Sequence, residues 1–328
     1  MIVVTGGAGL IGSAVARELN RRGVNDLILV DHLGTSEKWK NLRSLSFSRY
    51  MEKQDLPAWL DGNLKIRALH PEDIDAIIHL GACSSTTERD ASYLIENNYN
   101  YSINLAEFAR KKKIRFVYAS SAATYGDGNL GFEDSEEILD ELRPLNAYGY
   151  SKHAFDQWLK RKEFRGCAGI KYFNVFGPNE YHKGDMQSLV VKAYRQIRTE
   201  GKIRLFKSYR DDYADGEQMR DFFYVEDAAK MTVFLALDNT EACGLFNAGS
   251  GIARTWMDLA RSIFAAAGSE EKIEFVDMPE TLRDRYQYYT CAPIKKIRDA
   301  GFNDAISSLE KAVGDYVRNY LMKDESNA

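Results

Sequence analysis

Residues 2–12 read Ile-Val-Val-Thr-Gly-Gly-Ala-Gly-Leu-Ile-Gly, and this stretch decides the fold. The apolar run 2–5 predicts a parallel β-strand that is buried on both faces. The glycines that follow satisfy G-x-G-x-x-G, and amphipathic spacing predicts a helix from there to about Arg22. In such a strand–turn–helix unit the glycines let the backbone approach a pyrophosphate, which sits on the helix N-terminus. The stretch therefore predicts a dinucleotide-binding site rather than a purely structural glycine turn.

The end of the second predicted strand, residues 26–30, bears on the choice of cofactor. Asp31 follows it, about 20 residues after the last glycine, where an acidic residue meets the adenosine ribose. A carboxylate repels a 2′-phosphate and so favours NAD, whereas His32, Lys38 and Lys53 could neutralise that phosphate and favour NADP. The residues alone do not decide between NAD and NADP. Lys38 and Lys53 could also be ordinary solvated surface residues.

The segment YGYSK at residues 148–152 carries the predicted chemistry. If it opens a helix, Tyr148 and Lys152 lie one turn apart on the same face. An ammonium beside a phenol favours the phenolate and lowers its pKa from about 10, which makes Tyr148 a candidate general base. Ser121 ends another predicted strand, where it can hydrogen-bond a substrate hydroxyl or carbonyl. Alternatively, Tyr148 and Lys152 could be an ordinary pair on the surface, and Ser121 could simply cap the turn that follows it.

The composition predicts a soluble globular protein with one large domain or two closely joined ones. Its 328 residues are 45% hydrophobic and 28% charged, and the formal net charge is -4. This gives no basic footprint for nucleic acid, and no apolar run reaches the roughly 18 residues of a membrane span. We therefore expect no nucleic-acid partner, no membrane partner and no signal peptide. Four scattered cysteines without a C-x-x-C pair predict no metal site and a reducing, cytoplasmic location.

Strands and helices are predicted to alternate along the rest of the chain, which is typical of an α/β, Rossmann-type doubly wound parallel sheet. Residues 34–62 lack clear periodicity, so short helices and loops are expected there. Capping boxes are predicted at Thr255 with Asp258 and at Ser307 with Glu310. The other expected strands and helices are 76–80, 97–111, 114–119, 147–164, 168–174, 187–199, 204–206, 221–224, 226–237 and 245–248.

Two interleaved domains are expected rather than two domains joined by a linker. Residues 1–174 should form the NADP-binding Rossmann domain, to which a segment at about 221–248 returns. Residues 175–328 should form mainly a smaller α/β substrate-binding domain. The acidic stretch 209–218 is expected to be a surface insertion.

Taken together, several stretches resemble the extended short-chain dehydrogenases/reductases, and within them the ADP-glycero-manno-heptose 6-epimerases. The match covers nearly the whole chain. The resemblance implies one tightly bound NADP per subunit, with NAD less favoured, and a substrate of ADP linked to a seven-carbon sugar. It also implies a homo-oligomer, a pentamer in the family. The stretches are TGGAGLIG at 5–12, GACSSTTE at 81–88, YASSAATYG at 118–126, YGYSK at 148–152, YFNVFGP at 172–178, HKG at 182–184 and RYQ at 285–287.

The resemblance also implies roles for individual residues of this chain. Tyr148 and Lys183 become the two acid/base residues, supported by Lys152 and Ser121. His32 stands where the family usually has Asn, and Lys192 where it usually has His. Implied cofactor contacts are Gly6, Gly9, Leu10, Ile11, Gly12, Asp31, His32, Lys38, Lys53, Leu80, Gly81, Ala82, Cys83, Ser84, Asn97, Lys152 and Val175. Implied substrate contacts are Asn174, Asp185, Lys192, Phe206, Lys207, Ser208, Tyr209, Arg220 and Tyr286.

Three other functions and one other residue role stay open at this point. The chain could be an epimerase that acts at C4 of a hexose in another nucleotide sugar, or a non-catalytic regulator that binds NADP. A 4,6-dehydratase needs an acidic pair at the active-site strand end, where this chain has Ala122-Ala123-Thr124. Lys183 could bind a phosphate rather than transfer a proton.

Overall fold

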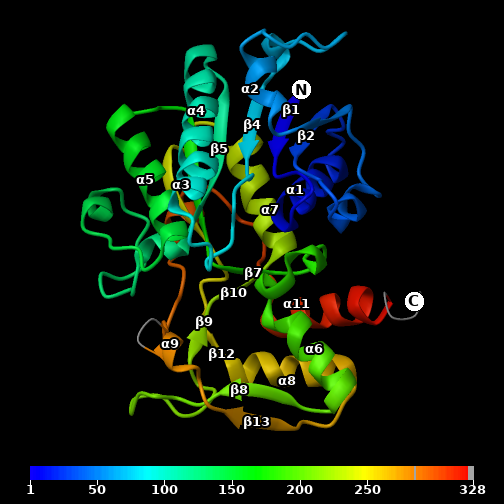
Figure 1. Ribbon diagram of the computed structural model, residues 1–328, viewed down its shortest axis with the longest axis vertical. Helices are drawn as coiled ribbons and strands as arrows, with labels where there is room; N and C mark the ends of the chain where they lie inside the picture. The colour runs from blue at the N-terminus through cyan, green and yellow to red at the C-terminus, as the bar shows by residue number, and fades with distance from the viewer. Residues whose placement is uncertain (284–285, 324–328) are drawn as a thin grey trace.

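The computed structural model describes residues 1–283 and 286–323, with Thr281 described by its backbone alone, and its centre is a seven-stranded parallel sheet. The strand order β11-β6-β5-β4-β1-β2-β3 confirms the predicted Rossmann-type doubly wound fold. The central strand β1 lies between β2 and β4, as Figure 1 shows. The strands are β1 (Ile2–Thr5), β2 (Leu27–Asp31), β3 (Arg49–Glu52), β4 (Ala76–His79), β5 (Arg115–Ser121), β6 (Cys167–Tyr172) and β11 (Gly244–Ala248).

Helices cover both faces of the sheet, because successive residues of each buried strand point to opposite sides. Ile2 and Val4 join the core beneath α1 and α7, and Val3 joins the core beneath α2, α4 and α5. The inner strands β1, β2 and β4 are therefore apolar in nearly every position rather than in alternate ones. The helices are α1 (Leu10–Arg21), α2 (Asp55–Leu60), α4 (Tyr101–Lys112), α5 (Ala147–Lys162) and α7 (Val225–Val233).

A smaller α/β unit lies below the sheet in Figure 1. Strand β8 pairs in parallel with β13, and β9 pairs antiparallel with β12, beside α6 and α8. Between β9 and β12 the chain returns to the sheet through β10, α7 and β11, so the two units are interleaved. Apolar side chains of both units belong to one continuous core, and those on the other face of the sheet form a second. The elements are α6 (Leu189–Glu200), β8 (Ile203–Phe206), β9 (Met219–Arg220), β10 (Phe222–Tyr224), β12 (Arg254–Thr255), α8 (Trp256–Ala267) and β13 (Ile273–Val276), with α9 (Glu280–Arg283), α10 (Lys295–Asp299) and α11 (Leu309–Tyr316) following.

Two predicted boundaries near the N-terminal half are wrong. Residues 34–62 contain not only short helices and loops but also the edge strand β3, whose RYME sequence is too polar to show strand periodicity. The helix predicted over 97–111 begins earlier, with α3 (Ala91–Leu94) capped by Asp90, and passes through a π-helical segment η3 (Ile95–Asn100). That wider turn shifts the helical register, which hides the earlier start from a 3.6-residue pattern.

Two boundaries in the second half also differ. The strand predicted over 168–174 stops at Tyr172, and a separate strand β7 (Asn174–Phe176) pairs with β10. The capping box of Thr255 and Asp258 is confirmed. For α11 the N-cap is Ser308, whose side chain accepts from the Lys311 N–H, so the assignment to Ser307 is one residue too early.

In the described part of the chain, no helix combines the length and the apolar character that a bilayer crossing requires.

Candidate active site

The carboxyl ends of the parallel strands gather many of the predicted site residues at one edge of the sheet. The glycine turn follows β1, Asp31 ends β2, and Lys53 follows β3. The loop 80–84 follows β4, and Ser121 ends β5. Asn174 begins β7, just beyond the end of β6. Because all these strands run in the same direction, residues far apart in the sequence meet along this edge.

The turn between β1 and α1 has the geometry of an anion site. Gly6 has a positive φ of 68°, and a Cβ atom on Gly12 would fall on the Gly6 carbonyl, so a side chain is excluded there. Gly9 caps α1 without a side-chain hydrogen bond, and no acidic residue occupies the first helical turn, which Leu10 and Ile11 open. Among the described residues, no side chain accepts from the first N–H groups of the helix. A dinucleotide pyrophosphate fits this cradle, because it is anionic and accepts hydrogen bonds.

Three donors hold the carboxylate of Asp31. The backbone N–H groups of Ala8 and His32 donate at 2.9 and 2.7 Å, and the Lys38 ammonium donates as well. Lys38 comes from the short helix η1 (Glu37–Leu42). The lysine neutralises the carboxylate that would otherwise repel a negatively charged group on the ribose.

A second cation and an unexpected acid lie at the neighbouring strand end. Lys53 donates its ammonium to the Asn97 side-chain oxygen at 2.7 Å. The His32 ring lies 3.1 Å from a Glu52 oxygen. Burial acts to raise the pKa of Glu52, but hydrogen bonds from Tyr50 and His32 lower it below its usual range. Glu52 was not predicted as a site residue because β3, the strand that carries it, was not predicted either.

The loop after β4, predicted to contact the cofactor through Leu80–Ser84, is fixed by one buried amide. Asn98 accepts from the Cys83 N–H at 2.8 Å and donates to the Cys83 carbonyl at 2.9 Å. The same amide donates to the Ser151 hydroxyl on α5 at 3.0 Å. Asn98 thereby ties this loop to the helix that carries Tyr148.

Tyr148 and Lys152 both face the end of β5. Tyr148 is half-buried, and its hydroxyl hydrogen-bonds the Ser121 side chain. Lys152 is buried, and its ammonium donates to the Ala119 carbonyl at 2.9 Å. The structure thus brings together the three residues that the sequence placed on two separate elements.

The electrostatics of this group differ from the sequence-based expectation. Burial raises the pKa of Tyr148, and the hydrogen bond with Ser121 acts in the opposite direction. Burial lowers the pKa of Lys152 to about 8. The prediction that Lys152 lowers the pKa of Tyr148 is therefore wrong for this arrangement, because burial dominates and the ammonium is directed at a strand carbonyl.

Lys183 lies in the short helix η6 (Tyr181–Met186), which packs against the glycine turn. The first residue of η6 donates its phenol to Asn41, whose amide donates to the Ala8 carbonyl at 2.7 Å. Burial lowers the pKa of Lys183, while the nearby Glu180 carboxylate acts to raise it. A lysine whose pKa is lowered can exchange a proton nearer to neutral pH.

A cavity of about 640 Å³ opens between β7 and the smaller unit. The Lys192 ammonium, at its wall, donates to the Asp185 carbonyl at 2.7 Å. Arg285, part of the RYQ stretch, lies outside the described residues. The predicted residues that line the cavity are Asn174, Val175, Lys192, Phe206 and Tyr286.

Arg220 contributes a buried positive charge next to this cavity. Its guanidinium lies 5.1 Å from the centre of the Tyr286 ring and 5.7 Å from that of Trp256. The Trp256 indole in turn donates to the Tyr286 hydroxyl at 2.8 Å. In residues 1–283 and 286–323, no carboxylate pairs with Arg220, whose guanidinium donates a hydrogen bond to the Met219 carbonyl. A buried guanidinium without an acidic partner is suited to an anionic ligand.

The three predicted substrate contacts that follow β8 lie outside the lining of this cavity, as do Asp185 and Arg220. Lys207 forms an ion pair with Asp277 at 3.1 Å, and the Ser208 hydroxyl donates to a neighbouring carbonyl. Tyr209 stacks beneath the Arg283 guanidinium at 3.9 Å. These residues follow β8 at the start of the acidic insertion, where local partners occupy their polar groups.

Residues 2–249 match the model of the NAD dependent epimerase/dehydratase family. The chain belongs to this family. It binds a nicotinamide cofactor and is an epimerase, an enzyme of the isomerase class, so a non-catalytic regulator is no longer an alternative.

Relatives match over almost their whole length. An ADP-L-glycero-D-manno-heptose-6-epimerase of Nitratidesulfovibrio vulgaris (strain DP4) is 51% identical over 323 residues, covering 98% of each chain. One of Fusobacterium nucleatum is 44% identical over 336 residues, covering 99% of each. The crystal structure of the Helicobacter pylori ADP-L-glycero-D-manno-heptose-6-epimerase is 26% identical, covers 97% of this chain and 95% of that one, and has a TM-score of 0.77.

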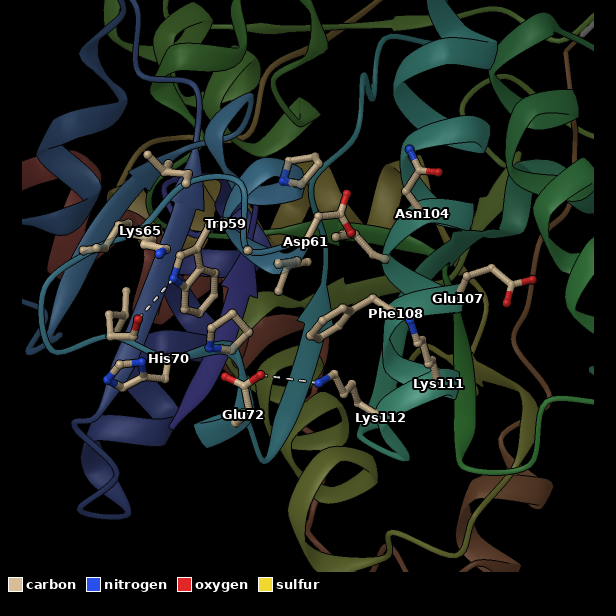
Figure 2. Close-up of a pocket in the computed structure, with 18 of the residues that line it drawn as sticks. Trp59, Asp61, Lys65, His70, Glu72, Asn104, Glu107, Phe108, Lys111 and Lys112 are labelled. Atoms are coloured by element: carbon tan, nitrogen blue, oxygen red, sulfur yellow. Dashed lines mark hydrogen bonds and ion pairs between the residues drawn. The ribbon is translucent and has the colours of Figure 1, made fainter.

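A larger hollow, of about 1170 Å³, lies away from this edge of the sheet. Figure 2 shows it between α4 and the segment that follows α2, where Trp59 donates to the Leu69 carbonyl. Its rim mixes charges of both signs, including the ion pair of Glu72 and Lys112. No predicted site residue lines it. Volume alone therefore does not locate the active site in this family member.

Several polar residues that shape the site were missed from the sequence. Asn98, Asn41 and Trp256 act through contacts with residues far away in the chain, so spacing does not reveal them. Asp156 had a detectable signal, because it continues the four-residue spacing of Tyr148 and Lys152 along α5.

Proposed function

We propose that this epimerase inverts C6 of the heptose in ADP-glycero-manno-heptose, using a bound NADP. The observation that carries the proposal is the full-length likeness to two relatives that bear this activity in their names. A C4 epimerase of a hexose nucleotide shares the fold, but no feature of the described cavity favours it.

The cofactor would lie along the carboxyl edge of the sheet, with its pyrophosphate on the N-terminus of α1. NADP is favoured over NAD because Lys38 already neutralises Asp31 and Lys53 adds a second charge at the next strand end. The remaining contacts proposed are the loop Leu80–Ser84 and, on the other side, Lys152 and Val175. When bound, the nicotinamide would supply reversible hydride transfer with the sugar carbon, and these residues would hold it in place.

The nucleotide diphosphate would lie against Arg220, because this buried guanidinium has no carboxylate partner among the described residues. The aromatic rings of Phe206 and Tyr286 border the cavity and offer flat surfaces for the adenine base. Asn174 and Lys192, the latter bonded to Asp185, lie on the side nearer β7.

Two acid/base residues would serve the two positions that the sugar oxygen occupies. Tyr148, hydrogen-bonded to Ser121, takes or gives the hydroxyl proton at the first. The sugar must turn before reduction from the other side, so its oxygen reaches a second place. Lys183 would serve that place, because burial lowers its pKa and its helix packs on the glycine turn. Proton transfer of this kind contributes about 10²–10⁴-fold for each residue.

The proposal extends to organisation and location. Residues 1–174, with the returning segment 221–248, would bind the cofactor, and residues 175–328 mainly the substrate. The enzyme would be a cytoplasmic homo-oligomer, a pentamer if it follows the family, and sedimentation equilibrium measures the subunit number directly.

Two measurements test the proposed function. Mass spectrometry of nucleotide released from denatured protein should identify NADP. Proton NMR should show interconversion of the two C6 epimers of ADP-heptose, and no turnover of UDP-glucose or UDP-galactose under the same conditions. Epimerisation of a UDP-hexose without turnover of ADP-heptose would replace this substrate by the C4 alternative.

A further inference from the structure

A buried carboxylate lies directly behind the proposed acid/base group. Asp156 follows Tyr148 and Lys152 on the same face of α5, two turns and one turn away. Its exposed fraction is 2%, and it accepts hydrogen bonds from the Tyr118 hydroxyl at 2.8 Å and the Ser120 hydroxyl at 2.7 Å. Both donors belong to β5. The carboxylate thus joins the helix of Tyr148 to the strand of Ser121.

A buried lysine completes this connection from the next strand. Lys171 on β6 is 1% exposed, and its ammonium lies 3.4 Å from an Asp156 oxygen. It also donates to the Thr124 hydroxyl at 2.6 Å and lies 4.4 Å from the centre of the Tyr125 ring. The Thr124 hydroxyl donates to the Ser121 carbonyl at 2.8 Å. The buried pair therefore holds the end of β5 both before and at Ser121.

Stability alone gives little reason for such a pair. Two charges that leave water lose solvation, and apolar residues of similar volume often stabilise a core equally well. What an ion pair with three hydrogen-bonding neighbours does provide is a fixed position for those neighbours. Here the neighbours are two strand-end side chains, Tyr118 and Ser120, and Thr124 in the turn that follows them.

We propose that Asp156 and Lys171 are positioning residues for the acid/base chemistry. The buried pair clamps the end of β5 against α5 and so fixes the Ser121 hydroxyl against that of Tyr148. This inference rests on the roles proposed above for Tyr148 and Ser121.

The charges around Tyr148 give the inference a distinctive signature. The hydrogen bond with Ser121, on β5, acts to lower the pKa of Tyr148. Two further groups act to raise it: Cys83, which follows β4, and Asp156, on the same helix as Tyr148. Asp156 in turn faces Lys152 on α5 and Lys171 on β6. Removing the Asp156 charge should lower the pKa of Tyr148, whereas removing the Lys171 charge should leave the carboxylate uncompensated and raise it.

Asp156→Asn and Lys171→Met should therefore shift the pH profile of kcat in opposite directions. Tyr148 acts as a base in its ionised form, so activity falls as the pH drops through its pKa. That acid limb should move to lower pH in Asp156→Asn and to higher pH in Lys171→Met. In both variants kcat should fall about 10- to 100-fold, while KM should stay within about threefold of the wild-type value. A misplaced acid/base group slows the reaction but leaves substrate binding largely unchanged.

A matched control breaks a different partly buried pair. Lys230 on α7 lies 3.4 Å from the buried Asp227, and Lys230→Met should leave both kcat and the acid limb unchanged.

The inference is overturned if Asp156→Asn and Lys171→Met lose thermal stability but keep the wild-type kcat and acid limb. If either single variant fails to fold, Asp156→Leu/Lys171→Met carries the test, since its core is neutral. A folded double variant with lowered kcat and unchanged KM supports positioning, and wild-type kcat excludes it.

Tyr148→Phe separates this inference from the function on which it rests. Full activity in that variant would remove Tyr148 from the reaction, whatever the result for Asp156. Loss of activity in Tyr148→Phe, with wild-type rate and pH profile in the Asp156 and Lys171 variants, would refute the positioning role alone.

Discussion

At the scale of single residues, burial acts on the two ionisable groups of the YGYSK segment in opposite directions. It raises the pKa of the Tyr148 phenol and lowers that of the Lys152 ammonium to about 8. In each case the neutral form is favoured, because the charged form loses its solvation. The hydrogen bond from Ser121 and the position of the hydroxyl, rather than the lysine charge, distinguish Tyr148 from other tyrosines in this structure.

Removing the phenolic oxygen tests the proposed role of Tyr148 most narrowly. Tyr148→Phe should bind NADP normally and lose at least about 100-fold in kcat, because only the proton-carrying group is removed. Cofactor fluorescence measures the binding, and NMR measures the turnover. The exposed neighbour gives a control, since Tyr150→Phe should keep full activity. A Tyr148→Phe enzyme within about threefold of the wild type would rule out the acid/base role.

Lys183→Met distinguishes proton transfer from phosphate binding. If Lys183 is the second acid/base residue, kcat should fall about 100-fold or more in both directions while KM stays nearly constant. Steady-state kinetics with each epimer give both constants. A rise in KM at unchanged kcat would assign the lysine to a phosphate instead.

Functional residues could be predicted from the sequence where they lie at short, regular spacings. The glycines, Asp31, and the pair of Tyr148 and Lys152 were found because their positions in the chain reflect one turn or one helical repeat. Trp256, which packs on Arg220, was not, because the two residues meet only in the folded chain, and Tyr286 was named only through the family resemblance. Spacing also gave no information about burial, which is why the pKa of Tyr148 was assigned the wrong direction.

At the scale of elements, buried strands and capped helices were predicted well, and edge elements were not. β1 begins and ends where its apolar run does, since both of its faces are covered. β3 is an edge strand with one partner and a polar sequence, so its pattern resembles that of a loop. The ends of β2 and β3, with η1, nevertheless carry the charges beside which the adenosine ribose is proposed to lie.

The charges at these two strand ends predict the cofactor preference. The unmodified enzyme should bind NADP more tightly than NAD, because Lys38 and Lys53 can contact the extra phosphate. Replacing both by Ala should weaken NADP by about 100-fold, roughly tenfold for each lost charged hydrogen bond, and change NAD little. Isothermal titration with both nucleotides measures the ratio. Tighter binding of NAD by the wild-type protein would show that Asp31 dominates.

The start of α11 offers a test of local structure. Ser308→Ala should lower the free energy of unfolding by about 1 kcal/mol, because its hydroxyl accepts from the Lys311 N–H. Ser307→Ala is the matched control and should have little effect, since Ser307 contributes its backbone N–H to Asp227. Denaturant unfolding of both variants gives the comparison, and equal losses would contradict the cap assignment.

At the scale of the whole molecule, the two units share one continuous core, so they are not independent domains. The return of the chain through β10, α7 and β11 places Arg220, on β9, directly before the strand that rejoins the large unit. Interleaving was predictable from the alternation of strand and helix patterns after residue 200. The cavity between the units was not, because side chains from many elements, far apart in the sequence, enclose it.

The central claim is that C6 is inverted by hydride removal and return with proton transfer at the oxygen alone. A carbon-bound hydrogen at C6 has no adjacent carbonyl in the substrate, so its loss as a proton would leave an unstabilised carbanion. The most direct measurement is epimerisation of ADP-heptose in heavy water, followed by NMR and mass spectrometry of the product. We predict full inversion with no deuterium at C6 and no requirement for added reductant. Stoichiometric deuterium at C6 would contradict hydride return, and with it the roles proposed for Tyr148 and Lys183.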